Sequence, residues 1–171
     1  MKIAMQAAER HVLNVIVDNE PGILAKITGM FTARGYNIDS LTVADISEDH
    51  AISRITIVTN GPEPVIDQIR AQLERLVPVH KVIDLTESGA HVERELALVK
   101  GSGKGDSRVE ALRLADAFRA TVIDANVEHF IFEITGRTSK IEQFIAIMAP
   151  LGLVEVCRTG VAAMSRGGEG M

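Results

Sequence analysis

A single cysteine, Cys157, occurs among the 171 residues, which excludes a fold held together by disulfide bonds within the chain. Long apolar runs are also missing, and none approaches the ~20 residues that would span a bilayer. The opening segment, MKIAMQAAER, lacks the apolar core of a secretory signal peptide. These three absences predict a protein of the reducing cytoplasm.

An excess of basic residues is missing as well. The chain has 18 Lys and Arg against 23 Asp and Glu, a formal net charge of -5. This balance predicts no basic face for a nucleic-acid backbone or an anionic membrane, so small neutral or zwitterionic molecules or other proteins are better candidates as partners. The apolar content, 46%, is enough to bury the core of one large or two small domains.

The first half of the chain shows the order strand, helix, strand, strand, helix, strand. Pro21 is expected at the first helical position, and Gly35 is expected as the left-handed residue that ends that helix. Pro62 or Pro64 begins the second predicted helix, and Pro78 ends it. The predicted strands are residues 11–18, 37–46, 51–60 and 80–86.

The second half repeats this order, with predicted strands at 94–101, 121–126, 129–136 and 153–160. Ser107 with Glu110, and Ser139 with Glu142, have the spacing of capping boxes and should begin the two helices. We therefore predict an α+β fold of two tandem ferredoxin-like units, residues 10–86 and 92–166, each a four-stranded antiparallel sheet with two helices on one face. Residues 87–93 are the expected hinge, and residues 165–171 are expected to fray.

The second strand of such a unit lies at an edge of its sheet. Here that strand contains Leu41, Val43 and Ile46 and has few charges to prevent pairing with another strand. Pairing of two such edges in a homodimer would satisfy the exposed backbone. The sequence thus predicts a dimer.

The segment that leads into the first helix is a candidate binding site. The first turn of a helix leaves backbone N–H groups unpaired and partly positive, so it attracts a carboxylate or phosphate. Gly22 allows close approach, Asn19 offers an amide, and Asn37 could reach the same pocket or that of a symmetry mate. The apolar wall is expected from Ile23, Leu24 and Ile38. Alternatively, Asn19 is only a helix cap, Gly22 a turn residue and the isoleucines core.

A family resemblance favours the binding-site interpretation. The segments NEPGIL, RGYNIDSLTV, VHKVIDLT and AHVERELALVK, with the later RTG, resemble the regulatory small subunit of acetolactate synthase, also called acetohydroxyacid synthase. The first unit of that family is an ACT domain. The resemblance extends from about residue 10 to residue 166.

The resemblance implies an ACT homodimer that binds a branched-chain amino acid, usually valine, between two ACT domains. By motif position, Asn19, Gly22, Ile23 and Leu24 would form one side of the pocket, and Asn37 and Ile38 the other. It also implies a separate catalytic large subunit that holds thiamine diphosphate, Mg²⁺ and FAD. This chain is then expected to be regulatory, with no catalytic residue, metal site or cofactor of its own.

Two other functions use the same topology. RNA-recognition domains share it, and Phe130 and Phe132 alternate on a strand as stacking aromatics do, but the basic-aromatic motif of that family is absent. A small acylphosphatase-like enzyme would need a phosphate-binding Arg with an Asn positioned for water, and no such pair can be assembled. The five histidines show no ligand spacing and are expected at strand ends or the surface, and Cys157 is expected to be structural.

Overall fold

The structure, a computed structural model, describes residues 8–171. The chain forms two compact units, the first comprising the residues up to Val92 together with Ala162–Met171, and the second Glu93–Val161. Most of the opening segment that was considered as a signal peptide, residues 1–7, lies outside the described residues. Within residues 8–171, no helix is both long and apolar enough to cross a membrane.

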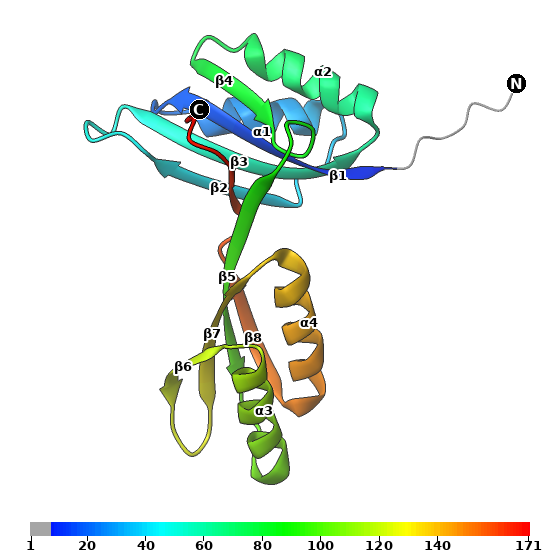
Figure 1. Cartoon of the computed structure of the whole chain (residues 1–171), viewed down its shortest axis with the longest axis vertical. Coiled ribbons are helices and arrows are strands. Elements are labelled where there is room, and N and C mark those ends of the chain that lie inside the picture. The colour runs from blue at the N-terminus through cyan, green and yellow to red at the C-terminus, as the bar shows by residue number, and fades with distance from the viewer. Residues whose placement is uncertain (1–7) are drawn as a thin grey trace, which may run out of the picture. The chain divides into compact units, whose positions relative to one another are not determined.

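The first unit has the predicted βαββαβ order, with both helices on one side of the sheet (Figure 1). Its elements are β1 (Glu9–Asp18), α1 (Ile23–Ala33), β2 (Ser40–Asp45), β3 (Ile52–Gly61), α2 (Glu63–Glu74) and β4 (Val79–Asp84). All neighbouring strands are antiparallel, in the order β2-β3-β1-β4. The predicted edge position of β2 is therefore confirmed.

Alternation along the central strands builds the core of this unit. Leu13, Val15 and Val17 of β1 point to the same face, where they meet the apolar side of α1 and α2. Two isoleucines of β3, Ile55 and Ile57, join them, and all five side chains are fully buried. Because α1 links β1 to β2 across β3, it lies over the half of the sheet that ends in the β2 edge.

The two ends of α1 differ in how well they were predicted. The helix begins at Ile23 and its N-cap is Gly22, so the expectation that Pro21 occupies the first helical position is wrong. Gly22 has a φ of +87°, in the left-handed region that glycine adopts readily. The chain is therefore not yet helical at Gly22, and Pro21 lies before the helix. The other end is as predicted: Gly35 has a φ of +69°, and the N–H of Tyr36 donates to the carbonyl of Phe31 over 3.0 Å.

The second unit repeats the order of elements (Figure 1), and its core is rich in phenylalanine. Its elements are β5 (His91–Gly101), α3 (Gly105–Ala117), β6 (Thr121–Ala125), β7 (Phe130–Gly136), α4 (Thr138–Met148), the short 3-10 turn η1 (Ala149–Leu151) and β8 (Leu153–Arg158). The strand order is β6-β7-β5-β8. Phe132 packs edge-on against Phe144 of α4, with ring centres 5.9 Å apart. The predicted fold class, two tandem ferredoxin-like units, is confirmed.

The capping boxes predicted for the second unit are wrong. Helix α3 begins two residues before Ser107, with Lys104 as its N-cap, and α4 has Arg137 as its N-cap, so Ser139 already lies inside the helix. The loop before α3 is fixed by packing instead. A Cβ atom on Gly103 would lie 2.8 Å from the carbonyl oxygen of Leu151, so the close approach of two backbone segments determines where α3 starts.

A ninth strand, β9 (Ala162–Ser165), was not predicted. It pairs with β5, which starts at His91, so residues 91–93 of the expected hinge already belong to a strand. The fully buried Asn14 of β1 donates from Nδ2 to the carbonyl of Ala163 over 2.8 Å and accepts from the hydroxyl of Thr56 over 2.9 Å. Residues 162–166, assigned from the sequence to the second unit, therefore group with the first, and the expected fraying of Ser165 is wrong.

Candidate functional site

The start of α1 presents backbone donors to solvent. Within the described residues, no side chain caps this end of the helix, and its first turn contains no acidic residue. The first α-helical bond runs from the N–H of Lys26 to the carbonyl of Gly22, over 3.0 Å. The N–H of Ile23 donates to the carbonyl of Glu20 over 3.3 Å, so the N–H groups of Leu24 and Ala25, with the helix dipole, make this end attractive to a carboxylate.

A pair of opposite charges flanks the helix start. Glu20, the acidic residue nearest in sequence, is paired with Lys26 at 3.2 Å between Oε1 and Nζ. Both side chains are about half exposed, so the pair is weakly held and screened by water. Gly22 adds no side chain, and a Cβ atom placed on it would meet no protein atom within 4 Å. A small anion can thus approach the backbone closely.

Asn19 is held at this end of the sheet by the hairpin tip that joins β2 and β3, residues 46–51. Its backbone N–H donates to the carbonyl of Ala51 over 2.7 Å, and its side-chain Nδ2 donates to the carbonyl of His50 over 2.8 Å. The side chain does not cap α1, whose N-cap is Gly22, so the alternative interpretation of Asn19 as a helix cap is wrong. Asn19 is exposed and oriented beside the helix start.

The hairpin tip itself is an ordered turn. The N–H of His50 donates to the carbonyl of Ser47 over 3.0 Å, and the imidazole is paired with the carboxylate of Asp45. A hydrogen bond with the Ser47 side chain, followed by one from the N–H of Ala51, holds the pKa of Asp49 below its ordinary value. Asp49 is therefore ionised at neutral pH and accepts from the backbone of the turn.

Asn37 lies at the opposite end of β3. Its carbonyl oxygen accepts from the hydroxyl of Thr59 over 2.7 Å, and its Nδ2 donates to the carboxylate of Asp39 over 2.6 Å. The carboxylate of Asp39 also accepts from the side-chain amide of Asn60. This side chain is thus fixed by polar neighbours in its own chain.

The sheet register separates the two asparagines. Asn19 is bonded to Ala51, just before β3, whereas Asn37 is bonded to Thr59, eight residues later. A strand rises about 3.3 Å per residue, so the two backbone positions are roughly 25 Å apart. One chain therefore cannot bring Asn19 and Asn37 to one small ligand.

The three apolar candidates have different surroundings. Ile23 is 6% exposed and packs in the core, so only its backbone faces the helix start. Ile38 is partly buried against the same core. Leu24 is 38% exposed and is the apolar side chain that the first turn of α1 offers to a ligand or a neighbouring chain. The interpretation of the isoleucines as core residues is correct for Ile23.

The edge strand β2 exposes apolar side chains near its Asp45 end, and no strand among residues 8–171 pairs with its outer side. Val43 is 43% exposed and Ile46 is 52% exposed. Val43 pairs with Ile55, a core residue, so the side chain of Val43 lies on the same face of the sheet as the helices. Val43 on β2 and Leu24 on α1 are thus exposed apolar side chains on the helix-covered side of the same sheet.

Comparisons with known proteins agree with this architecture. A family model described as the AHAS small subunit-like ACT domain matches residues 13–81, and one described as the small subunit of acetolactate synthase matches residues 94–167. The probable acetolactate synthase small subunit of Archaeoglobus fulgidus is 41% identical, with 94% of this chain and 99% of that protein covered. The Escherichia coli acetolactate synthase isozyme 3 small subunit is 43% identical, with 92% and 96% covered.

The chain belongs to the acetolactate synthase small-subunit family. The crystal structure of the small subunit from Thermotoga maritima superimposes with a TM-score of 0.83 at 38% identity, covering 94% of this chain and 99% of that one. The first unit is thus the family's ACT domain, as the resemblance implied.

The RTG motif that contributed to the family resemblance has a structural role in the second unit. Arg158 makes a two-pronged ion pair with Glu95, which is nearly fully buried, and this hydrogen bond raises the pKa of Arg158. Thr159 donates its N–H to the carbonyl of Leu96 over 3.0 Å. The motif therefore holds the end of β8 against β5 within the second unit.

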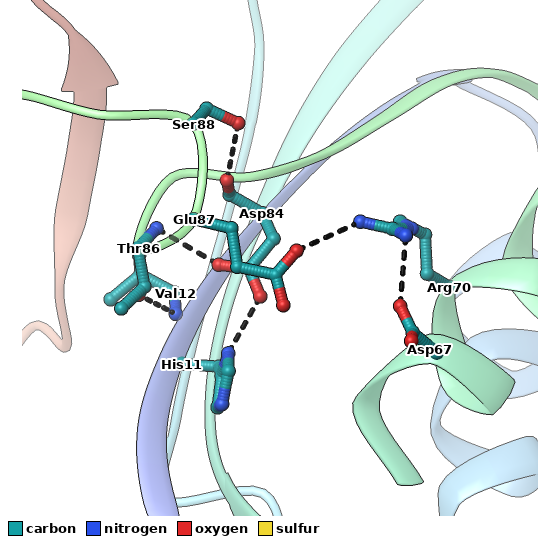
Figure 2. Close-up of polar contacts among 8 residues, drawn as sticks. All are labelled: His11, Val12, Asp67, Arg70, Asp84, Thr86, Glu87 and Ser88. Carbon is teal, nitrogen blue, oxygen red and sulfur yellow. Dashed lines mark hydrogen bonds and ion pairs between the residues drawn. The ribbon is translucent and has the colours of Figure 1, made fainter. Parts of the chain in front are cut away.

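A buried polar cluster of the ACT unit was missed by the sequence analysis (Figure 2). His11 is 3% exposed, and its Nδ1 lies 2.7 Å from the carboxylate of Asp84, which also accepts from the N–H of Thr86 over 2.9 Å. The expectation that every histidine lies at a strand end or on the surface is wrong for His11. Its position two residues before Leu13, on the inward-facing side of β1, was the available signal.

This cluster also includes the one group of potential metal ligands found in residues 8–171. Atoms of His11, Asp84 and Glu87 lie within 4.8 Å of one another. Each already has a partner, however, because Glu87 accepts from Arg70 over 3.2 Å and the other two pair with each other (Figure 2). A cation would have to displace Arg70 and the Nδ1 proton, so the cluster fits better as an anchor joining β1, β4 and α2.

The remaining candidates from the sequence lie in the core of the second unit or on the surface. Phe130 and Phe132 are 1% and 0% exposed, so neither ring is available to stack on a base, and the RNA-binding alternative loses its main feature. Cys157 is an exposed free thiol on β8. His80 and His129 are partly exposed and pair with Asp18 and Asp124.

Proposed function

We propose that this chain is the regulatory, non-catalytic subunit of acetolactate synthase and that it senses a branched-chain amino acid, valine first among them. The observation that carries this proposal is the exposed, uncapped start of α1 with the oriented amide of Asn19 beside it. Membership of the small-subunit family supports the assignment. The proposed site consists of Asn19, Gly22, Ile23 and Leu24 from one chain, with Asn37 and Ile38 from a second copy.

The need for a second copy follows from the strand register. In a two-fold dimer paired through β2, the two edge strands run antiparallel. The Ser40 end of one β2 then meets the Asp45 end of the other. Because Asn37 precedes Ser40, and Asn19 lies at the Asp45 end of the sheet, the partner's Asn37 approaches the first chain's Asn19. A homodimer would contain two such pockets.

The pocket suits the chemistry of a small aliphatic amino acid. A carboxylate is stabilised by the N–H groups and dipole of the first turn of α1. Leu24 supplies exposed apolar surface for a branched side chain. Valine, leucine and isoleucine differ by one methylene group or its position, a difference worth only about 1 to 3 kcal/mol in an apolar pocket. One such pocket therefore suits all three amino acids.

In this proposal the catalytic chemistry belongs to a separate large subunit. That subunit binds thiamine diphosphate, Mg²⁺ and FAD and joins two pyruvates into 2-acetolactate with release of carbon dioxide. This chain binds the end-product amino acid and shifts the large subunit between a more active and a less active arrangement. Such control requires that the effector bind one arrangement more tightly, with a coupling free energy of roughly 1 to 3 kcal/mol.

Isothermal calorimetry of the full chain against valine, leucine, isoleucine and a non-branched amino acid tests this proposal. We expect saturable binding of the branched-chain amino acids, up to one molecule per chain. Asn19→Ala should weaken valine binding by on the order of 1 kcal/mol, the value of a lost hydrogen bond, while the circular dichroism spectrum stays unchanged. Undiminished affinity in a folded Asn19→Ala protein would show that the site lies elsewhere.

A further inference from the structure

The face of the ACT sheet that points away from α1 and α2 carries a row of three aligned side chains. Ile16 of β1 lies between the core residues Val15 and Val17, so its side chain points away from the helices. Ile16 pairs with Arg54 of β3 on one side and with Lys81 of β4 on the other. Directly opposite residues of antiparallel strands share a face, so Arg54, Ile16 and Lys81 form one row, the basic row.

The C-terminal strand β9 covers a different part of this face. Asn14, which precedes Ile16 by two residues and points the same way, is fully buried and bonded to the carbonyl of Ala163 in β9. Ile16 and Arg54 are only partly buried, and Lys81 is exposed. The basic row is therefore accessible beside the part of the face that β9 covers.

Both cations of the basic row lack an acidic partner. No carboxylate of residues 8–171 forms an ion pair with Arg54 or Lys81. The Nε of Arg54 is buried and has no hydrogen-bond partner in this part of the chain. Asp18, which ends β1, is paired with His80 over 2.6 Å. The row is thus a local excess of positive charge in a chain whose formal net charge is -5.

The spacing of the two cations suits a partner that bears carboxylates. Neighbouring strands lie about 4.8 Å apart, so the backbones of Arg54 and Lys81, on either side of β1, are roughly 10 Å apart. Their long side chains can reach one acidic segment from two sides, and a guanidinium binds a carboxylate through two parallel N–H bonds. Ile16 offers apolar contact between them. The row therefore fits an acidic protein segment.

We propose that the basic row binds an acidic segment of the catalytic large subunit. The inference rests on the proposed function, which requires such a subunit, and it adds the surface at which the two chains meet. A second copy of this chain is a poorer occupant, because contact between two identical rows would bring like charges together. Pairing through β2 keeps the helix-free faces of both chains on one side of a continuous sheet, so the proposed dimer would present two basic rows.

Titration of the large subunit with the full chain tests this surface. Binding is followed by sedimentation velocity, and the formation of acetolactate is measured in parallel. We expect the double variant Arg54→Gln, Lys81→Gln to bind at least about tenfold more weakly, the effect of lost charge-assisted hydrogen bonds. Its valine affinity by calorimetry should stay within about twofold of the native value, because Asn19, Gly22 and Asn37 share no partner with the row.

Three further variants separate charge from structure. Arg75→Gln removes an exposed cation at the C-cap of α2, in the same unit, and should bind the large subunit as the native chain does. Lys81→Arg keeps the charge of the row and should stay within about twofold of native affinity. Lys81→Gln alone, at an exposed position where folding is not at risk, should weaken binding about threefold.

Ionic strength provides an independent readout. Added salt should weaken the native complex more than the complex of the double variant, since screening acts on the charges that the variant has lost. A purely structural effect of the substitutions would leave the two salt dependences equal, and that result would overturn the inference.

The remaining outcomes separate the inference from the proposed function. Native affinity of the folded double variant for the large subunit would overturn the assignment of this surface, and so would an equal loss in Arg75→Gln. A changed sedimentation of the double variant on its own would identify a second copy as the occupant and would also overturn it. Failure of the native chain to bind or stimulate the large subunit would instead refute the proposed function, and the inference with it.

Discussion

Replacement of Val43 by lysine is expected to convert the proposed dimer into monomers and, in the same step, to remove the proposed valine binding. Val43 lies near the middle of β2, and its 43% exposed side chain would be buried at a two-fold interface formed by that edge. A buried, unpaired ammonium costs several kcal/mol, and two-fold symmetry brings two of them together. Asn19, Gly22 and Asn37 remain intact in this variant, so the loss of binding would come from the loss of the partner.

The matched control is Val77→Lys. Val77 is 95% exposed and belongs to the turn before β4, in the same unit but away from the β2 edge. We expect sedimentation velocity to show a monomer for Val43→Lys and a dimer for Val77→Lys, with valine binding retained only in the control. A monomeric Val43→Lys protein that bound valine with native affinity would mean that one chain contains the whole site.

Replacement of Gly22 by aspartate is expected to lower valine affinity by at least about 100-fold. Like charges about 4 Å apart near a protein surface repel by roughly 4 kcal/mol, and the new carboxylate would stand where the ligand's carboxylate binds. Crowding within the protein does not explain such a loss, because a Cβ atom at this position meets no atom within 4 Å.

Gly22→Asn separates charge from backbone strain. Asparagine has nearly the shape of aspartate and tolerates the left-handed region that a φ of +87° requires. Calorimetry with valine should therefore show a loss of less than about tenfold for this variant. If Gly22→Asp bound valine as the native chain does, the carboxylate would have to lie away from the start of α1.

The fold was largely predictable because alternation and helical periodicity are repeated consistently in both units. The inward-facing Leu13, Val15 and Val17 identify β1 and its buried face without any knowledge of partners. Gly35 was predictable for a similar reason, since a left-handed residue after the last apolar turn of a helix is a local requirement. Local patterns of this kind were sufficient wherever neighbours in sequence are also neighbours in space.

Features that depend on distant neighbours were missed. Strand β9 has only four residues and no β-branched or aromatic side chain that would mark it as a strand, yet Ala163 accepts from Asn14, which lies 149 residues earlier. The start of α3 was misplaced because the backbone of Gly103 packs against Leu151, a contact that overrides the local preference of Ser107 as a cap. In both cases a tertiary contact determines the local structure.

The candidate site was predictable in its residues and not in its geometry. Gly22, Asn19 and Asn37 could be selected by residue type and by family resemblance. The 31-residue separation of Asn19 and His50, and the left-handed turn that brings them together, have no sequence signal. The separation of Asn19 from Asn37 could be recognised only from the strand register. That separation is the reason why the proposed site needs residues from two chains.

Subunit complementation tests the central claim, a pocket shared between two chains, most directly. Chains carrying Asn19→Ala are unfolded, mixed with Asn37→Ala chains and refolded together, and valine binding is measured by calorimetry. In a mixed dimer one pocket has both substitutions and the other has neither, so about one quarter of all pockets should regain native affinity. Each variant refolded alone should have no pocket of native affinity. If the mixture binds no better than the separate variants, Asn19 and Asn37 do not meet across a dimer and the account is wrong.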